Sequence, residues 1–225
     1  MGRKSKVEFL SSMKSIAALS LTVVAFLCLL SGCSTAQQIP ANNQPQTAEK
    51  KILIVYLTRT GNTEAVAKMI QQKTGGDLIG LELETPYPKD YQAIVKQVAD
   101  ENEKGFLPPL KTKIDVGRYQ TIFLGFPTWG MQLPPPLKSF LKQYDLSGKT
   151  VIPFNTNAGY GVGSSFQTVR ELCPKSTVLE GFEIKGGIER DGILFVMEGD
   201  KEKEARTKVD QWLNKIGAVK QSPSN

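Results

Sequence analysis

The stretch ILIVYLTRTGNT, residues 52–63, decides the fold of this chain. Its first six residues, 52–57, are apolar at every position, which predicts a strand buried on both faces of a sheet. The polar turn that follows leads into apolar residues at helical spacing, Val66, Met69 and Ile70. A buried strand that passes through a short turn into a helix is typical of a parallel α/β sheet.

The same alternation of strands and helices continues along the chain. Further buried strands are predicted at 121–126 and 151–154, and weaker ones at 77–83 and 178–184. Each intervening helix has one apolar face, which we interpret as part of the core. In the second helix this face consists of Tyr91, Ile94, Val95 and Val98. The order β-α-β-α-β-α-β-α-β-α predicts a parallel sheet with right-handed crossovers and helices on both faces.

The first candidate site is the turn that follows the first strand, because ligands of such sheets bind beyond the carboxyl ends of the strands. The turn runs into a helix, whose free N–H groups and dipole suit an anion. Three hydroxyls, an amide and a glycine that permits close approach fit a phosphate monoester. These residues are Thr58, Arg59, Thr60, Gly61, Asn62 and Thr63. An ordinary turn in which Thr60 or Thr63 caps the helix is the alternative.

Two further loops are expected at the same edge of the sheet, after Phe126 and Phe154. The second loop offers an aromatic plane beside a flexible glycine peptide, although its tryptophan could instead pack on a neighbouring helix. Its residues are Pro127, Thr128, Trp129 and Gly130. The third loop is a glycine-rich turn, or a loop whose backbone N–H groups approach the edge of a planar heterocycle. Its residues are Asn155, Thr156, Asn157, Ala158, Gly159, Tyr160 and Gly161.

Together, the three loops offer phosphate donors, a stacking ring and a hydrogen-bonding backbone in the order that one mononucleotide requires. Here the sequence resembles the flavodoxin family, in particular its lipoprotein-type branch. The resemblance rests on five segments that follow the family's order: TRTGNT, GFPTW, PPPLKSFL, SGKTVIPFNT and LCPKSTVLEGFEIKG. It extends from residue 52 to residue 184 and includes the final helix.

The resemblance implies a flavodoxin-like α/β fold, with a five-stranded parallel sheet in the order 2-1-3-4-5, and FMN as the cofactor. The phosphate would bind at 58–63. The flavin ring would lie between the Trp129 loop and residues 157–161, with Tyr160 as a candidate second stacking ring. Rotation of a peptide near Gly130 is the family's device for hydrogen-bonding the reduced ring.

The chain also departs from the family pattern. Asn157 and Ala158 stand where the branch often has histidine and glycine. For Arg59, pairing with the phosphate and pointing into solvent are both open. Flavodoxins are strongly acidic, whereas this chain is not, which puts a very low reduction potential and the usual basic partners in doubt.

The N-terminal region is predicted to export and anchor the protein. Residues 1–32 combine a basic start with an apolar run and end in Leu-Ser-Gly before Cys33. This pattern resembles a lipobox and predicts a signal peptide followed by a lipidated cysteine; a plain signal peptide or a short signal anchor is the alternative. Residues 33–49 predict a flexible polar tether. The folded domain is expected at 50–218, with a polar tail at 219–225.

Composition excludes several classes of site. The sequence has no histidine, which excludes His-based triads, His metal ligands and His general bases, and no metal site is predicted. Removal of the signal takes away four of 28 basic residues and one of 22 acidic residues, which leaves a net charge near +3. This charge is too small and scattered to predict nucleic-acid binding. With Cys28 removed and Cys33 lipidated, only Cys173 remains, and we expect a buried thiol.

These features predict an FMN-binding electron carrier at the cell envelope, tethered to a membrane outside the cytoplasm. Its partner would be a redox protein or a small electron acceptor, and no catalytic residue is predicted. The alternative is an FMN-dependent reductase that passes two electrons from NAD(P)H to a quinone or azo compound. A binding module that has lost its flavin is a third hypothesis. Two segments have no assigned role: an extended loop at 103–118, and 186–199, where a small hairpin is expected. Surface elaboration is the favoured interpretation of 186–199, and a border of the flavin or of a partner is the alternative.

Overall fold

The computed structural model describes residues 51–219. The predicted signal peptide, the lipidated Cys33, the tether and the tail from Lys220 lie outside these residues. No helix within 51–219 is both long and apolar enough to cross a membrane.

The sheet at the centre of the fold is parallel, with the strand order β2-β1-β3-β4-β5. β1 spans Ile52–Tyr56, β2 Asp77–Gly80, β3 Thr121–Pro127 and β4 Thr150–Asn157. Because β1, β3 and β4 each have a neighbour on both sides, their central residues are buried, as continuous apolar runs require. The predicted strand order and parallel sheet are confirmed.

The fifth strand, expected at 178–184, is divided into two short strands that both pair with β4. β5 spans Thr177–Val178 and β6 spans Phe182–Lys185. Between them, Gly181 lies so close to Phe166 that a Cβ atom there would be 2.6 Å from the ring. The Glu180 carbonyl accepts a hydrogen bond from the Trp212 indole at 3.0 Å. Contacts with side chains of two different helices therefore interrupt the strand.

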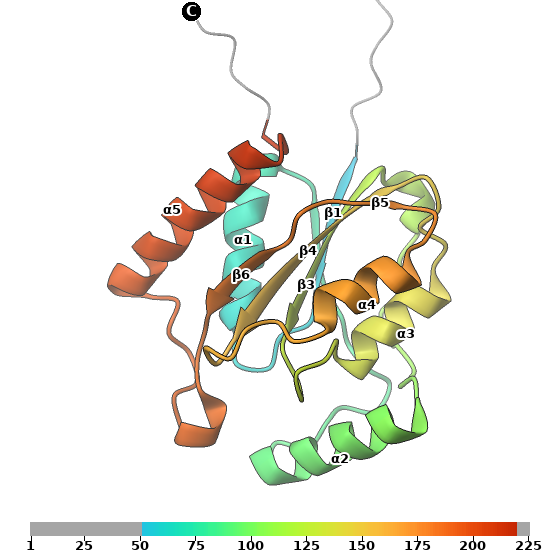
Figure 1. Ribbon diagram of the computed structural model, residues 1–225, viewed down its shortest axis with the longest axis vertical. Helices are drawn as coiled ribbons and strands as arrows, with labels where there is room; N and C mark the ends of the chain where they lie inside the picture. Colours follow the sequence, from blue (N-terminus) through green and yellow to red (C-terminus); the bar gives the residue numbers. More distant parts are fainter. Residues whose placement is uncertain (1–50, 220–225) are drawn as a thin grey trace, which may run out of the picture. The chain divides into compact units, whose positions relative to one another are not determined.

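Helices cover both faces of the sheet, as predicted (Figure 1). α1, Asn62–Thr74, and α5, Gly199–Lys215, pack on one face in a core that includes Ile54 and Phe154. α3, Pro135–Gln143, and α4, Ser165–Leu172, pack on the other face in a core that includes Phe126 and Phe140. Each face of the sheet thus has its own apolar cluster.

Cys173, directly after α4, belongs to the second of these clusters and is buried, as expected. Burial raises the pKa of its thiol to about 11. The thiol is therefore protonated at neutral pH and is a weak nucleophile.

Helix α2, Tyr91–Lys104, lies beyond the carboxyl ends of the strands and not on a face of the sheet (Figure 1). Ile94 and Val98 are buried, but Val95 is 45% exposed. The interpretation of this apolar face as core is therefore wrong in part, because the face also lines a cavity. The loop expected at 103–118 is shorter than predicted, since α2 ends at Lys104 and a 3-10 turn occupies Val116–Arg118.

Candidate functional site

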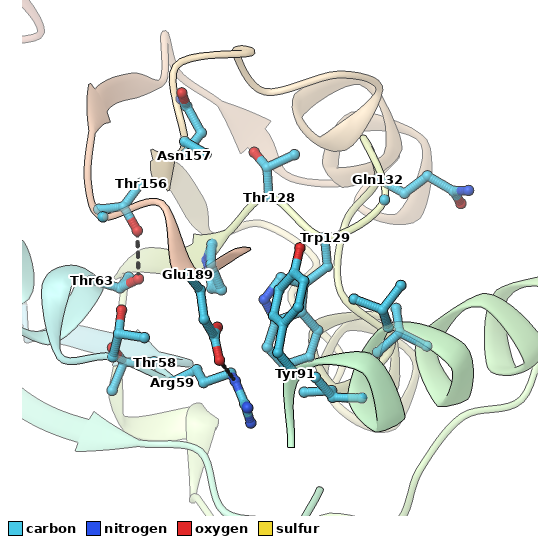
Figure 2. Close-up of a pocket in the computed structure, with 18 of the residues that line it drawn as sticks. Thr58, Arg59, Thr63, Tyr91, Thr128, Trp129, Gln132, Thr156, Asn157 and Glu189 are labelled. Carbon is cyan, nitrogen blue, oxygen red and sulfur yellow. Dashed lines mark hydrogen bonds and ion pairs between the residues drawn. The ribbon is translucent and has the colours of Figure 1, made fainter. Parts of the chain in front are cut away.

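The three predicted loops meet at one cavity at the carboxyl edge of the sheet (Figure 2). The cavity has a volume of about 540 Å³, which is in the range of small-ligand sites. Twelve of the predicted residues line it. They are Thr58, Arg59, Thr60, Asn62, Thr63, Pro127, Thr128, Trp129, Gly130, Thr156, Asn157 and Ala158. Parallel strands thus bring three distant segments to one place.

Threonine hydroxyls gather at one end of the cavity, where α1 begins (Figure 2). The hydroxyls of Thr63 and Thr156 are hydrogen-bonded at 2.8 Å, and the Thr58 hydroxyl accepts from the Gly61 amide at 3.0 Å. Gly61 has a φ of 84°, and no side chain caps the amino end of α1. Neither Thr60 nor Thr63 therefore acts as an ordinary cap. The Thr58 hydroxyl hydrogen and the first-turn amides of α1 are suited to an anion.

Arg59 makes contacts that neither of the two sequence-based alternatives foresaw. Its Nε donates to Glu189 at 2.5 Å, and the two side chains are 17% and 22% exposed. Its terminal nitrogens donate to the carbonyls of Pro88 and Lys89, at 2.8 and 2.6 Å. Arg59 therefore joins the first loop to the entry of α2 and to the segment after β6. Glu189 balances its charge.

Asn62 is buried, and its amide binds the segment 186–199. Nδ2 donates to the Leu194 carbonyl at 2.6 Å, and Oδ1 accepts from the Val196 amide at 3.0 Å. Nδ2 also donates to the Thr60 hydroxyl at 2.8 Å. This amide was expected to bind a phosphate, but in the structure it bonds with protein groups and fixes the turn.

The segment 186–199 folds back on itself beside the cavity. A 3-10 turn at Glu189–Asp191 is closed by an antiparallel bridge between Ile188 and Ile193, which is the small hairpin expected. Gly187 and Glu189 line the cavity. The favoured interpretation of this segment as surface elaboration is therefore wrong, because the segment forms one wall of the site.

Trp129 lies at the start of a tight turn in the second loop. The backbones of Trp129 and Gln132 exchange hydrogen bonds of 3.4 and 3.0 Å, and the two residues between them, Gly130 and Met131, have φ values of 56° and 60°. A positive φ is strained for methionine but not for glycine. The Trp129 ring meets the Tyr87 ring at 86°, with centroids 5.4 Å apart. The turn and this contact hold an aromatic ring in the cavity.

Side-chain amides fix the third loop. The Asn157 Oδ1 accepts from the amides of Gly159 and Gly161, at 2.8 and 3.3 Å. Asn155 is fully buried and donates to the Thr128 hydroxyl at 3.0 Å, which ties the third loop to the second. The asparagine at 157, a departure from the family pattern, therefore shapes the loop from within.

The remaining predicted residues lie around the cavity rather than in its wall. Tyr160 and Gly161 line a smaller adjoining cavity of about 210 Å³, and Tyr160 is 66% exposed. Gly61, Asn155 and Gly159 line neither cavity. Tyr91, which was not predicted, lines both, so it is better placed than Tyr160 as the second aromatic side chain of the site.

Ten lining residues were not predicted, and most of them belong to α2. They are Tyr91, Ile94, Val95, Val98, Ala99, Asn102, Glu103, Gln132, Gly187 and Glu189. Helical spacing indicates that one face of α2 is covered, but it does not say that a cavity lies against that face. The site thus combines a hydroxyl-rich end, an aromatic ring and an apolar helix wall. Such a set suits a ligand with a phosphate and a planar ring.

Solved flavoproteins share this fold. A flavoprotein from Bacteroides eggerthii has a TM-score of 0.60 and 28% identity, over 76% of this chain and 99% of that protein. A flavoprotein from Lactobacillus acidophilus, solved in complex with FMN, has a TM-score of 0.54 and 24% identity, over 64% and 98% of the two chains.

Sequence comparisons agree with the fold. The chain is 28% identical to a flavodoxin from a Nostoc species over 150 residues, which are 65% of this chain and 74% of the relative. It is 29% identical to a flavodoxin from a Synechocystis species over 121 residues, 52% of this chain and 58% of the relative. The Flavodoxin family model matches residues 51–199, a span that includes all three loops, α2 and the segment 186–199. The chain therefore belongs to the flavodoxin family.

Proposed function

We propose that this chain binds one FMN between its three strand-end loops and carries electrons, one at a time, to a redox protein or a small acceptor. The observation that carries the proposal is that threonine hydroxyls, uncapped helix amides and an aromatic ring line one cavity. Membership of the flavodoxin family supports the same cofactor. FMN, once bound, supplies the redox chemistry, and the protein supplies binding, orientation and electrostatics.

The cavity offers partners for the phosphate and for the ring of FMN. The oxygens of Thr58 and Thr60 accept hydrogen bonds from protein groups, so their hydroxyl hydrogens are available to a phosphate. The ring fits beside Trp129, against the apolar wall of α2. Gly130 has a positive φ, which glycine adopts without strain, and its peptide would lie where it could hydrogen-bond a ring bound beside Trp129.

FMN titration of the purified protein tests this function. We expect saturable binding with quenching of tryptophan fluorescence, and weaker binding of riboflavin, which lacks the phosphate. Stepwise chemical reduction of the FMN-bound protein should proceed in two separate one-electron steps. The FMN-bound protein should not oxidise NAD(P)H. Reduction by NAD(P)H in a single two-electron step would favour the reductase instead. Absence of any FMN binding would overturn both the electron-carrier function and the reductase function.

Replacement of Glu189 with glutamine should tighten FMN binding about tenfold and leave riboflavin binding unchanged. The amide keeps an oxygen for the Arg59 Nε but removes the charge that balances this guanidinium. Two unit charges roughly 10 Å apart, at an effective dielectric constant of about 20, interact by about 1.7 kcal/mol, which corresponds to a change in affinity of the order of tenfold. Calorimetric titration with each flavin measures the difference.

The control for this variant is Glu82→Gln, which removes the partner of Lys111 in an exposed ion pair away from the cavity. The Glu82→Gln variant should change the affinity for neither FMN nor riboflavin. If Glu189→Gln alters the two flavin affinities equally, Glu189 acts through the shape of the loop and not through its charge.

We further propose that a lipid on Cys33 anchors the protein in the cell envelope, outside the cytoplasm. The support is the basic, apolar and Leu-Ser-Gly-Cys pattern of residues 1–33. A lipid chain on the first residue of the mature protein would leave residues 34–49 as a polar spacer before β1.

Replacement of Cys33 with alanine should move most of the protein from the membrane fraction to the soluble fraction of the envelope. The reason is that the lipid chain contributes the apolar area that holds the protein in the bilayer. Fractionation followed by immunoblotting measures the distribution, and FMN affinity should not change. A variant that stays in the membrane would contradict lipid anchoring, and Cys173→Ala is the matched control.

A further inference from the structure

The Trp129 ring contacts an aromatic ring from another segment. The backbone of Trp129 belongs to a turn of only two central residues, Gly130 and Met131. A side chain on such a turn can take several rotamers unless something packs against it. The ring that packs against it, at right angles and with centroids 5.4 Å apart, is Tyr87.

Tyr87 is in turn held by a buried carboxylate on α2. Its hydroxyl donates a short hydrogen bond to Glu101 Oε2, and Glu101 is only 4% exposed. Burial first, and then the contact with Glu101, raises the pKa of Tyr87 far above its usual value, so the phenol stays protonated and keeps its donor. The other carboxylate oxygen accepts from Gln97 Nε2 at 2.8 Å.

A carboxylate is an unusual side chain at a position as buried as Glu101. Within residues 51–219, Glu101 forms no ion pair, and its side-chain partners are the neutral groups of Tyr87 and Gln97. A buried carboxylate without a cation is destabilising relative to an apolar side chain of similar volume. A role in stability alone therefore does not account for it, whereas a role in aiming the Tyr87 ring does.

From this chain of contacts we infer that Tyr87 and Glu101 are positioning residues that fix the Trp129 ring for stacking on the flavin. The inference rests on the proposed function, because it gives that site its aromatic geometry. Glu101 orients Tyr87 through the hydroxyl, and Tyr87 orients Trp129 through the ring contact. Through Glu101, the position of α2 is coupled to the orientation of Trp129.

Two variants break the chain of contacts while they preserve volume. Tyr87→Phe removes the hydroxyl and keeps the ring, and Glu101→Leu removes the acceptor. Each should weaken FMN binding about three- to tenfold. Each should also change the near-ultraviolet circular dichroism of Trp129 in the FMN-free protein, measured in a Trp212→Phe background, where Trp129 is the one tryptophan left. Glu101→Gln keeps an acceptor oxygen and should bind FMN within about twofold of the parent.

The chain contains a matched control at the other edge of the sheet. The buried Tyr119 donates its hydroxyl hydrogen to Asp77 at 2.6 Å, away from the cavity, and this bond first, and then burial, raises the pKa of Tyr119 too. Tyr119→Phe should change stability without changing FMN affinity or the Trp129 signal.

The outcomes separate this inference from the proposed function. Parental FMN affinity and an unchanged Trp129 signal in both Tyr87→Phe and Glu101→Leu would overturn the positioning role. A parent protein that binds no FMN would overturn the function, and the dichroism of the FMN-free variants would still decide whether Tyr87 and Glu101 orient Trp129.

Discussion

Replacement of Trp129 with alanine is expected to weaken FMN binding by about 10- to 100-fold. Stacking of a planar heterocycle on an aromatic side chain is worth about 1–3 kcal/mol, and Trp129 is a half-buried ring that lines the cavity. The same change should have a small effect on the free energy of unfolding, because much of the ring is not covered by the core. Fluorometric or calorimetric FMN titration, with thermal unfolding in parallel, measures both quantities.

Trp212→Ala should give the opposite result. Trp212 is 6% exposed and packs against the rings of Phe123 and Phe182, on the face covered by α1 and α5. Its loss should cost about 3–5 kcal/mol of stability, as for other large core side chains. The fraction that stays folded should bind FMN with parental affinity. Equal losses of affinity in the two variants would mean that Trp129 does not contact the flavin.

The sheet could be predicted from sequence because its central strands carry an unambiguous pattern. A run such as 52–57, apolar on both alternating sides, is stable only between two neighbours and under helices on both faces. The break in the fifth strand could not be predicted. It depends on Phe166 and Trp212, which approach Gly181 and Glu180 from helices α4 and α5.

The position of α2 could not be predicted for a related reason. A helical repeat of apolar residues shows that one face is covered, but it does not identify what covers it. The apolar face of α2 lies against a cavity and a neighbouring loop, so Val95 stays largely exposed. A charged residue buried on the same helix, Glu101, has no local sequence signal, because Tyr87 becomes its partner only in the folded chain.

The positions of the three loops in the fold could be predicted from the sequence, but the roles of several of their side chains could not. Position followed from topology, since strands that run in parallel end at one edge. Arg59 and Asn62 were read as possible ligands, but their partners Glu189 and Leu194 lie 130 and 132 residues away in sequence. The sequence around Arg59 or Asn62 carries no signal of a partner so far away along the chain. The segment 186–199 therefore had no assigned role until the fold placed it.

Replacement of Gly163 with alanine should lower the free energy of unfolding by about 3 kcal/mol and weaken FMN binding at least tenfold. Gly163 has a φ of 56°, and a Cβ atom there would lie 2.0 Å from the Met131 carbonyl oxygen. That oxygen accepts a hydrogen bond from the Ser164 amide at 3.0 Å, so the added methyl group must displace the turn that carries Trp129. Overpacking costs about 1–3 kcal/mol, and the left-handed backbone adds about 1–2 kcal/mol. Chemical denaturation and FMN titration measure the two effects.

The control for Gly163 separates the backbone cost from the collision. Gly148 also has a positive φ, 73°, but a Cβ atom there would meet nothing within 4 Å. Gly148→Ala should therefore cost only the backbone term of about 1–2 kcal/mol and leave FMN affinity unchanged. If Gly163→Ala loses no more stability than Gly148→Ala, the segment around Gly163 has room to move away from Met131. If it also keeps parental FMN affinity, the contact between Gly163 and Met131 does not hold Trp129 in place. We expect the loss of stability and the loss of FMN affinity to occur together, because the added methyl group would displace the Met131 carbonyl and with it the turn that carries Trp129.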